Sequence, residues 1–354
     1  MDDISKAPPR RVVQWTTGNV GRQAVAAIAA RPDLELVGVY AHDPAKAGRD
    51  AAELCGLDTP TGVLATGDVD ALFALRPDCV VYAPLHIDVD EVARILEAGI
   101  NVVTTAEFVT GTSLGPEATA TIDAAALAGG VTILGTGINP GFAEVFAGVA
   151  AGLSQGVRTI KVTESVDVTM FANDPNFAAV GWGRPPGDPG HAEAVEAATA
   201  VFSDALDLLA GLVGLPLDDR VCTVEFAHAT EELDIPGMVI PKGHVAGMHV
   251  GWDGIVEGVT RLGIHQRWVV GDRIEPAWTV ELGYVVEVAG DPNVRVKLDV
   301  WPDGDLAAMG VDEFRAVGMR MTAVPAVNAI PAVCAAPPGI RTYADLPPVA
   351  AHMA

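Results

Sequence analysis

The chain has 354 residues, of which 50% are hydrophobic, and 46 acidic against 22 basic residues give a formal net charge of −24. The length predicts two domains that each bury a core, and the acidic surface repels polyanions, which argues against nucleic acid as a partner. The four cysteines, Cys55, Cys79, Cys222 and Cys334, are far apart and form no C-x-x-C pair, so we expect no metal site, no disulfide framework and a cytoplasmic location.

A strand, a glycine turn and a helix open the chain in that order. The apolar run 11–15 has strand length, 24–28 is helical, and Gly18-Asn19-Val20-Gly21 lies between them. Gly18 permits the tight turn, Gly21 lets the backbone approach a pyrophosphate, and the helix N-terminus favours the phosphate charge. We expect Gly18, Asn19, Val20 and Gly21 to bind a dinucleotide, although an ordinary strand-to-helix turn has a similar pattern.

The segment after the second strand, 34–40, bears on the choice of cofactor. An acidic residue there holds the ribose hydroxyl of NAD, whereas basic residues hold the 2′-phosphate of NADP. Asp43 comes slightly late for the first role, and His42, Lys46 and Arg49 suit the second. We therefore expect NADP(H) to be preferred and NAD(H) to be possible; a solvated basic helix start would look the same.

Further strands alternate with helices, which predicts a Rossmann-type, doubly wound parallel sheet over 1–140. Expected strands at 78–84, 100–105 and 131–134 deliver Ala83, Pro84, Thr105 and Asn139 to the carboxyl edge, where ligands bind. Asn139 suits a bond to the nicotinamide carboxamide, or a structural role in an Asn-Pro-Gly turn. The uncharged stretch 124–143 contains repeated glycine and proline breaks, so no membrane span is expected.

Glu107 follows the strand 100–105, where such a sheet presents side chains to the nicotinamide. A carboxylate at this position suggests acid/base chemistry beside a hydride. Its alternative role is to cap the turn that follows, because helix starts commonly contain Glu.

The second expected domain, 141–312, is α+β with a mostly antiparallel sheet. Its expected helices are 143–153 and 192–213, and its expected strands are 159–168, 221–229, 238–252, 254–268, 277–288 and 294–301, with hairpin breaks at 252–254 and 270–272. Such a sheet exposes a face or an edge, so we expect a homodimer. The last segment, 313–354, begins with a helix over 313–329 and is expected to return to the first domain. Asn328 on this helix is expected to contact the cofactor or to form a docking hydrogen bond.

The expected substrate pocket contains Phe142, Phe171, Trp182 and His265, with His244, His249 and Trp268 as further candidates. The Gly/Pro-rich loop 180–190 is either a lid or a surface connection. Few basic residues are present to clamp a substrate carboxylate, which favours a small uncharged carbonyl compound, although Arg261 and Arg267 leave a charged substrate open.

Four motifs in order carry a resemblance across most of the chain: Thr-Gly-Asn-Val-Gly-Arg-Gln-Ala at 17–24, Tyr-Ala-Pro at 82–84, Thr-Thr-Ala-Glu-Phe at 104–108 and Gly-Thr-Gly-Ile-Asn-Pro-Gly-Phe at 135–142. The chain resembles the native amine dehydrogenase and 2,4-diaminopentanoate dehydrogenase branch of the dihydrodipicolinate reductase-like superfamily. The paired histidines, lysine and Asp-Ala-Pro-Ser-Gly-Thr run of dihydrodipicolinate reductases are missing, and Pro-Lys-Gly-His at 241–244 does not match them.

The resemblance implies reductive amination of a ketone or aldehyde with ammonia and NAD(P)H, or the reverse oxidative deamination, with Glu107 as the acid/base. Two alternatives stay within this superfamily, a diaminopentanoate dehydrogenase that acts on a charged diamino acid and a reductase of a cyclic imine. A third is a nucleotide-sensing protein without catalysis, for which a retained Glu107 is not expected.

Overall fold

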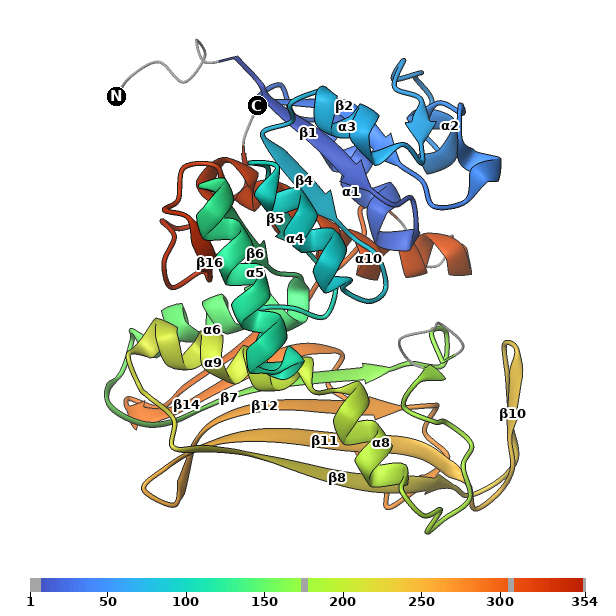
Figure 1. Ribbon diagram of the computed structural model, residues 1–354. Helices are drawn as coiled ribbons and strands as arrows, with labels where there is room; N and C mark the ends of the chain where they lie inside the picture. The colour runs from blue at the N-terminus through green and yellow to red at the C-terminus, as the bar shows by residue number, and fades with distance from the viewer. Residues whose placement is uncertain (1–7, 173–177, 305–308, 353–354) are drawn as a thin grey trace. The chain divides into compact units, whose positions relative to one another are not determined.

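The computed structural model describes residues 8–172, 178–304 and 309–352, and it divides into two compact units (Figure 1). The first unit contains Met1–Phe142 and Ala316–Ala354, and the second contains Ala143–Arg315. The C-terminal segment from Ala316 onward therefore belongs to the first unit.

The first unit is built on a seven-stranded sheet in the order β16-β6-β5-β4-β1-β2-β3. Every pair of neighbours in it is parallel, so the carboxyl ends of all these strands meet at one edge. This confirms the Rossmann-type sheet. The strands are β1 (Arg10–Trp15), β2 (Leu34–Tyr40), β3 (Ala65–Thr66), β4 (Cys79–Tyr82), β5 (Asn101–Thr104), β6 (Thr132–Gly135) and β16 (Gly339–Arg341).

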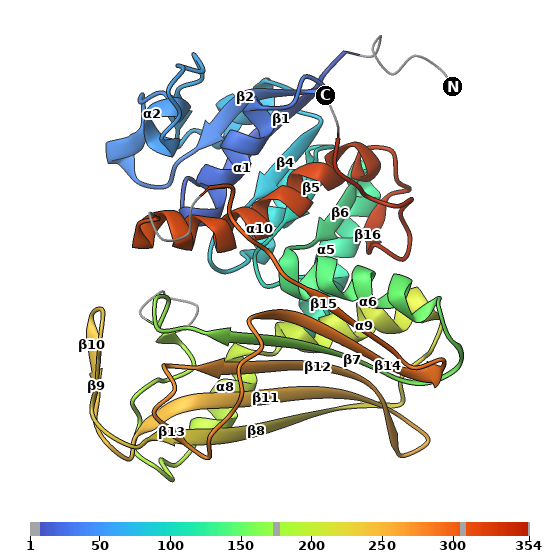
Figure 2. The same ribbon diagram turned by 180° about the vertical axis from the view of Figure 1, so that it is seen from behind.

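Helices cover both faces of this sheet, with α3, α4 and α5 on one face and α1 and α10 on the other (Figures 1 and 2). The helices of this unit are α1 (Asn19–Ala29), η2 (Pro44–Lys46), α2 (Ala51–Cys55), α3 (Val69–Ala74), α4 (Val89–Glu97), η3 (Thr112–Leu114), α5 (Pro116–Gly129) and most of α10 (Val311–Val333). The core on the α4 and α5 side joins strand residues such as Val80 and Val102 to Ile95 and Ile122. Burying these apolar side chains is the main force that holds the layers together.

Helix α10 is longer than the helix predicted over 313–329 and continues past Pro325 and Pro331, which lie inside it. By length and composition alone, its segment Asp312–Val333 is apolar enough to cross a membrane. Ala326 and Ile330 are nevertheless fully buried, and the Asn328 side chain is bonded to Arg31. We therefore interpret the C-terminal half of α10 as packed into the core of the first unit.

The second unit contains a seven-stranded sheet in the order β13-β8-β11-β12-β7-β14-β15. Only β12 and β7 among these neighbours pair in parallel, which confirms the mostly antiparallel sheet over the described residues. The strands are β7 (Gln155–Asp167), β8 (Asp219–Ala229), β11 (Val245–Val256), β12 (Val259–Val269), β13 (Ile274–Glu275), β14 (Gly283–Asp291) and β15 (Val294–Leu298), with β9 (Leu233–Ile235) and β10 (Met238–Ile240) as a separate hairpin. The helices are α6 (Ala143–Ala151), α8 (His191–Ala198) and α9 (Val201–Val213).

Several predictions about the second unit were wrong. The break expected at 270–272 is not a hairpin, because β12 pairs with β11 and β7, whereas the next strand, β13, pairs with β8. The hairpin between β11 and β12 turns at Glu257 and Gly258, not at 252–254. Both turn residues have the positive φ that a tight hairpin needs. The single helix expected over 192–213 ends at Thr199, whose hydroxyl donates to Val195 O and accepts from Trp252 Nε1. The strand expected over 238–252 is divided between β10 and β11.

A single methyl group at Gly135 is expected to destabilise the fold. Gly135 ends β6, and a Cβ there would lie 1.9 Å from the carbonyl oxygen of Phe108, the residue after Glu107. Backbone cannot move aside as a flexible side chain does, so we expect Gly135→Ala to lower the free energy of unfolding by about 1–3 kcal/mol, as overpacking does. Urea denaturation measures the change.

Gly67→Ala is the matched control, because the nearest atom to its new Cβ is Ala41 O at 3.5 Å. We expect a change within about 0.5 kcal/mol, as at other unremarkable surface positions. Equal unfolding free energies for Gly135→Ala and the parent protein would show that the turn carrying Glu107 is not held against β6.

Candidate active site

The carboxyl ends of four strands form a continuous row in the first unit. Backbone hydrogen bonds continue past the strand ends, from Ala83 N to Trp15 O (3.2 Å), Thr105 N to Tyr82 O (3.1 Å) and Thr136 N to Thr104 O (2.8 Å). The predicted residues Ala83 and Thr105 therefore lie at neighbouring positions on the edge where such sheets bind ligands.

The glycine turn is fixed at this edge by Thr16. Its hydroxyl donates to Ala83 O at 2.9 Å, and its backbone has a φ of 72°, a left-handed conformation that is uncommon outside glycine. Gly21 lies directly against this turn, since a Cβ at Gly21 would be 2.4 Å from Thr16 O. A Cβ at Gly18 would meet nothing within 4 Å, so this side of the turn is open.

The N-terminus of α1 differs from those of the neighbouring helices. Helices α2, α3 and α4 are capped by the carboxylates of Asp50, Asp68 and Asp88, whereas α1 is capped by Gly18 without a side-chain bond and has no acidic residue in its first turn. Its backbone N–H groups and the positive end of its dipole are thus available to an anion. Gly18, Asn19, Val20 and Gly21 fit a pyrophosphate on these grounds.

The segment after β2 brings a cation to the glycine turn. Lys46 Nζ donates to Thr17 Oγ1 at 3.0 Å. The Asp43 carboxylate instead accepts from Ala45 N at 2.9 Å and caps η2. His42 is exposed, and Arg49 pairs with Glu53 along α2. Of the three basic residues predicted to bind a 2′-phosphate, Lys46 is the one bonded to the turn.

Glu107 follows β5 in a conformation that the surrounding chain holds in place. Its φ is 38°, and its neighbours Ala106 and Phe108 are buried while its own side chain is 46% exposed. Ala106 N donates to Thr104 Oγ1 at 3.0 Å. A non-glycine residue in this conformation persists only where its surroundings enforce it, which is common at functional sites.

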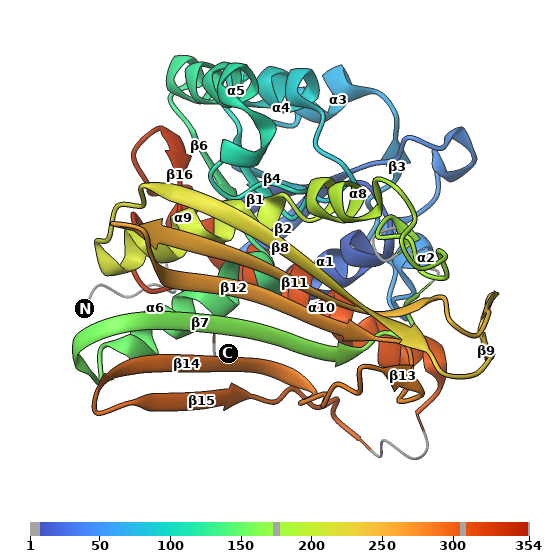
Figure 3. The same cartoon turned by 90° about the horizontal axis from the view of Figure 1, so that it is seen from below.

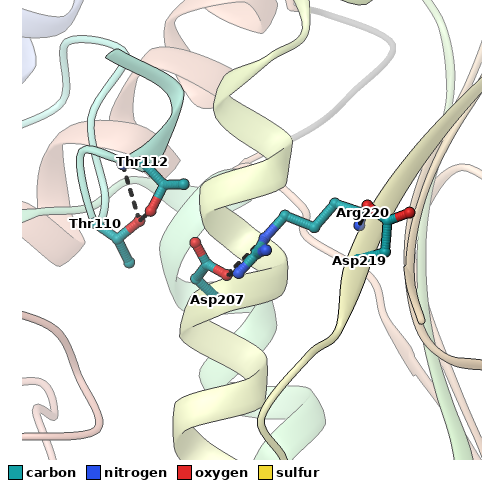
Figure 4. A network of polar contacts seen from close by, with 5 residues as sticks. All are labelled: Thr110, Thr112, Asp207, Asp219 and Arg220. Carbon is teal, nitrogen blue, oxygen red and sulfur yellow. Dashed lines mark hydrogen bonds and ion pairs between the residues drawn. The ribbon is translucent and has the colours of Figure 1, made fainter. Parts of the chain in front are cut away.

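The carboxylate of Glu107 does not cap the next helical turn. That turn, η3, begins at Gly111 without a side-chain cap bond. In the segment that joins Glu107 to η3, the hydroxyl of Thr110 lies 3.1 Å from that of Thr112 (Figure 4). Glu107 Oε2 instead lies 2.8 Å from Nδ1 of His86. The structural alternative for Glu107 is therefore not supported.

His86 is a residue of this edge that the sequence analysis missed. It lies on the loop after β4, the strand that pairs with β5, and its side chain is 72% exposed. Loops that follow adjacent parallel strands lie side by side, so the pairing of β4 with β5 reveals this residue.

Tyr82 secures the loop that carries His86. Its hydroxyl donates to Glu91 Oε2 at 2.7 Å and accepts from Asp88 N at 3.2 Å. Burial, followed by the hydrogen bond to Glu91, raises the pKa of Tyr82 far above its usual value, so the hydroxyl keeps its proton and remains a donor. The loop is thus fastened at both of its ends.

Asn139 and Phe142 follow β6 on an irregular segment, Ile138–Phe142. Phe142 N donates to Gly137 O at 3.0 Å, and Gly141 has a φ of 133° that favours glycine. The C-terminal tail supports this region through Tyr343, whose hydroxyl lies 2.7 Å from Thr136 Oγ1. The contacts of Asn139 with a nicotinamide and of Phe142 with a substrate remain predictions.

The cofactor role predicted for Asn328 is contradicted. Its Oδ1 accepts from the guanidinium of Arg31 at 2.9 Å, and Arg31 follows the C-terminal end of α1, opposite the glycine turn. The second role considered for Asn328, a docking hydrogen bond, describes this contact.

The pocket candidates Phe171, Trp182 and His265 lie in the second unit and remain predictions. The Phe171 ring packs at 6.2 Å from that of Phe314, and Trp182 is largely buried. The loop around Trp182 is anchored where Gly183 N donates to Val245 O at 2.9 Å. His265 bonds to Asp253 and His249 within the sheet at 3.1 Å each.

Two family models match successive parts of the chain, and the second match continues past the second unit into the C-terminal segment of the first. Residues 12–133 match the N-terminal domain of dihydrodipicolinate reductase, and residues 190–354 match the C-terminal domain of 2,4-diaminopentanoate dehydrogenase.

Comparison with individual proteins extends over nearly the whole chain. An amine dehydrogenase of Streptomyces virginiae is 30% identical over 351 residues, which cover 95% of each chain. A 2,4-diaminopentanoate dehydrogenase of Acetoanaerobium sticklandii is 26% identical over 73% of this chain and 69% of its own.

Among solved structures, the amine dehydrogenase of Mycobacterium smegmatis has the same fold, with a TM-score of 0.77 and 22% identity over 97% of each chain. The NAD complex of GenD2 from gentamicin A biosynthesis is more distant, with a TM-score of 0.52 and 15% identity over 92% of this chain and 87% of its own. The identity to the Streptomyces virginiae enzyme extends over nearly the full length of both chains. The family is therefore the one that the sequence resembles, and the chain belongs to the amine dehydrogenase family of NAD(P)-dependent oxidoreductases.

Proposed function

We propose that the protein catalyses reductive amination of small ketones and aldehydes, with ammonia and NAD(P)H, to primary amines, together with the reverse oxidative deamination. The observation that carries this proposal is the position of Glu107, a partly exposed carboxylate on the strand edge shared with the glycine turn. Family membership supports the same chemistry.

The cofactor supplies a hydride to the substrate when it is bound. On the protein side, Gly18 to Gly21 and the uncapped start of α1 would hold the pyrophosphate. Ala83, Pro84, Thr105 and Asn139 occupy the strand ends where the nicotinamide of a Rossmann-type enzyme is bound.

Glu107 supplies the proton transfers that amination requires. Ammonium has to lose a proton before its nitrogen can add to a carbonyl carbon, and Glu107 accepts that proton. The carbinolamine then loses its hydroxyl as water, for which Glu107 donates a proton. The carboxylate finally stands opposite the positive charge of the iminium group that accepts the hydride. Such acid/base catalysis typically contributes ~10²–10⁴ in rate.

The arginines of the second unit favour an uncharged substrate. Arg261 donates through its guanidinium to the backbone carbonyls of Arg158 and Val157, at 2.5 and 3.3 Å. Arg267 donates to Thr279 O at 3.5 Å. Both candidates for a carboxylate clamp are thus bonded to the protein itself, which supports small aliphatic or alicyclic carbonyl compounds.

A second candidate is a diamino acid substrate, as in 2,4-diaminopentanoate dehydrogenases. The match of residues 190–354 to the C-terminal domain of those enzymes favours it. The two substrate classes are separated by screening neutral ketones against keto acids with ammonia and NADPH.

Replacing Glu107 by Gln tests the acid/base role directly. Gln keeps the size and hydrogen bonding of the side chain but carries no charge and exchanges no proton. We expect Glu107→Gln to lose at least ~10²-fold in kcat for amination, the lower end of the range for acid/base catalysis, while the Kd for NADPH changes little. NADPH oxidation and fluorescence titration measure the two quantities.

Glu117→Gln is the matched control, because Glu117 is an exposed carboxylate in the first turn of α5. It should retain parental activity. Near-parental amination by Glu107→Gln would contradict the mechanism, and equal NADPH oxidation by the parent with and without ammonia would indicate carbonyl reduction instead.

We propose further that NADP(H) is preferred over NAD(H), with Lys46 as the main contact of the 2′-phosphate. The bond of Lys46 to Thr17 places its ammonium group beside the glycine turn, and the Asp43 carboxylate is engaged in capping. His42 and Arg49 add positive charge or hydrogen bonds from the same segment, although Arg49 shares its guanidinium with Glu53.

Lys46→Ala should raise the Kd for NADPH about tenfold and leave that for NADH nearly unchanged. The reason is that a hydrogen bond to a charged group contributes about 1.5–3 kcal/mol, and 1.4 kcal/mol corresponds to a factor of ten. Fluorescence titration of both cofactors provides the measurement, with Lys242→Ala in the second unit as control. Tighter binding of NADH than of NADPH by the parent protein would overturn the assignment.

We also propose a cytoplasmic homodimer. The four cysteines are free, as in a reducing compartment. In the second unit, α6, α8 and α9 lie on one face of the sheet (Figure 3). On that side Arg220 of β8 pairs with Asp207 of α9, as Figure 4 shows. Successive side chains of a strand point to opposite faces of its sheet. The opposite face of β8 therefore presents Val221, Thr223 and Glu225, which are exposed. A second copy of the chain on this face would cover them.

Light scattering is expected to give twice the chain mass of 36.6 kDa at working concentration. Val221→Asp should weaken the dimer, because it would place a carboxylate at the interface, whereas Val149→Asp, at an exposed position of α6, should not. A monomeric mass for the parent protein would refute the dimer.

A further inference from the structure

We infer that His86 is a positioning residue for Glu107, and that it passes protons between the Glu107 carboxylate and solvent. This inference rests on the proposed amination chemistry. It adds a second group, through which the Glu107 carboxylate regains or loses a proton. The pair joins two loops that follow adjacent parallel strands, β4 and β5.

The direction of the hydrogen bond between the two side chains follows from the protonation state of the carboxyl group. His86 Nδ1 and Glu107 Oε2 are 2.8 Å apart, the usual length of a charge-assisted bond. An ionised carboxylate only accepts, so in the state in which Glu107 is ionised Nδ1 carries the hydrogen and donates it. The side chain of His86 is 72% exposed, which leaves the other ring nitrogen, Nε2, in reach of water. One ring thus contacts both the carboxylate and solvent.

Such a contact gives the proposed reaction a route for the proton that it consumes when its product is the protonated amine. A ketone, an ammonium ion, NAD(P)H and one proton give a protonated primary amine, NAD(P)⁺ and water. Glu107 returns the ammonium proton to the departing hydroxyl, so the proton that ends on the product amine has to come from solvent. Histidine is the side chain whose ordinary titration lies nearest to neutral pH, and it can accept at Nε2 as it donates at Nδ1.

Three ionisable groups on the His86 loop and on α4 have structural partners of their own. Asp88 accepts from Glu91 N at 3.0 Å and caps α4, and Glu91 accepts from the Tyr82 hydroxyl. Arg94, at the end of the same helix, pairs with Asp70. Among the ion pairs formed by the described residues, the one that involves Glu107 is with His86.

The exposure of the pair makes substitutions interpretable. Exposed ion pairs contribute little to stability, so loss of His86 should leave the fold intact. An effect on turnover then reflects the chemistry of the pair rather than unfolding. Thermal unfolding of each variant verifies this.

Two substitutions at His86 separate orientation from proton exchange. In His86→Asn the amide nitrogen takes the place of Nδ1 and donates to Glu107, but it does not titrate; His86→Leu removes both properties. We expect His86→Leu to lose ~10-fold to ~10²-fold in kcat for amination, at or below the lower range of acid/base catalysis. His86→Asn should keep the KM for ammonia near that of the parent and lose kcat, and added imidazole should restore its turnover. His352→Asn, an exposed histidine near the C-terminus, is the control and should resemble the parent.

A second readout does not depend on turnover. Nuclear magnetic resonance of protein labelled with ¹⁵N-histidine assigns the His86 signals by their loss in His86→Asn. We expect a protonated Nδ1 in the parent protein, and Glu107→Gln should shift both ring nitrogens of His86.

The outcomes distinguish this inference from the proposed function. Parental activity in His86→Leu, with Glu107→Gln inactive, would overturn the role of His86 and leave the amination mechanism standing. Full activity of His86→Asn without any response to imidazole would reduce His86 to an orienting contact and refute proton exchange. Absence of ammonia-dependent turnover in the parent protein would instead refute the proposed function, and unchanged His86 resonances in Glu107→Gln would refute the pair itself.

Discussion

The alignment of the parallel strand ends is the constraint on which the candidate site depends. Backbone hydrogen bonds continue this alignment beyond the strands, from Ala83 to Trp15, from Thr105 to Tyr82 and from Thr136 to Thr104. They place the glycine turn, the His86 loop and the Glu107 turn along one edge. The Phe108 carbonyl packs against Gly135 so closely that no side chain fits between them, which fixes the turn that presents Glu107. Backbone packing therefore sets the positions of the loops from which the side chains of the site extend.

Charge is distributed along this edge in a way that suits an anionic cofactor on an acidic protein. The chain carries a net charge of −24, yet α1 begins without the carboxylate cap found on α2, α3 and α4. Lys46 adds a cation at the same turn. A helix N-terminus attracts phosphate through its free N–H groups and its dipole, and a carboxylate there would compete with the phosphate. The absence of a carboxylate cap on α1 therefore leaves the N-terminus of this helix available to a phosphate group.

Much of the first unit could be predicted from the sequence because its signals are local. Strand length, the glycine turn and the repeated alternation of strand and helix predicted the sheet and the place of Glu107 on it. His86 was missed because its importance comes from a neighbouring strand, and such pairing is not a local property. Asn328 was misjudged for a related reason, since an apolar helix does not reveal which end of α1 it meets. In the second unit the turn at Glu257 and Gly258 was misplaced, because Asp253-Gly254 has the better turn sequence and the actual turn places a non-glycine residue at positive φ.

The central claim is that nitrogen from ammonia enters the product at the site held by Glu107. Mass spectrometry of the product formed from a small cyclic ketone, ¹⁵N-labelled ammonium and NADPH tests this most directly. The account predicts a primary amine that contains one ¹⁵N atom, formed by the parent protein and not by Glu107→Gln. An alcohol without nitrogen as the product of the parent protein would contradict it, because Glu107 would then serve carbonyl reduction.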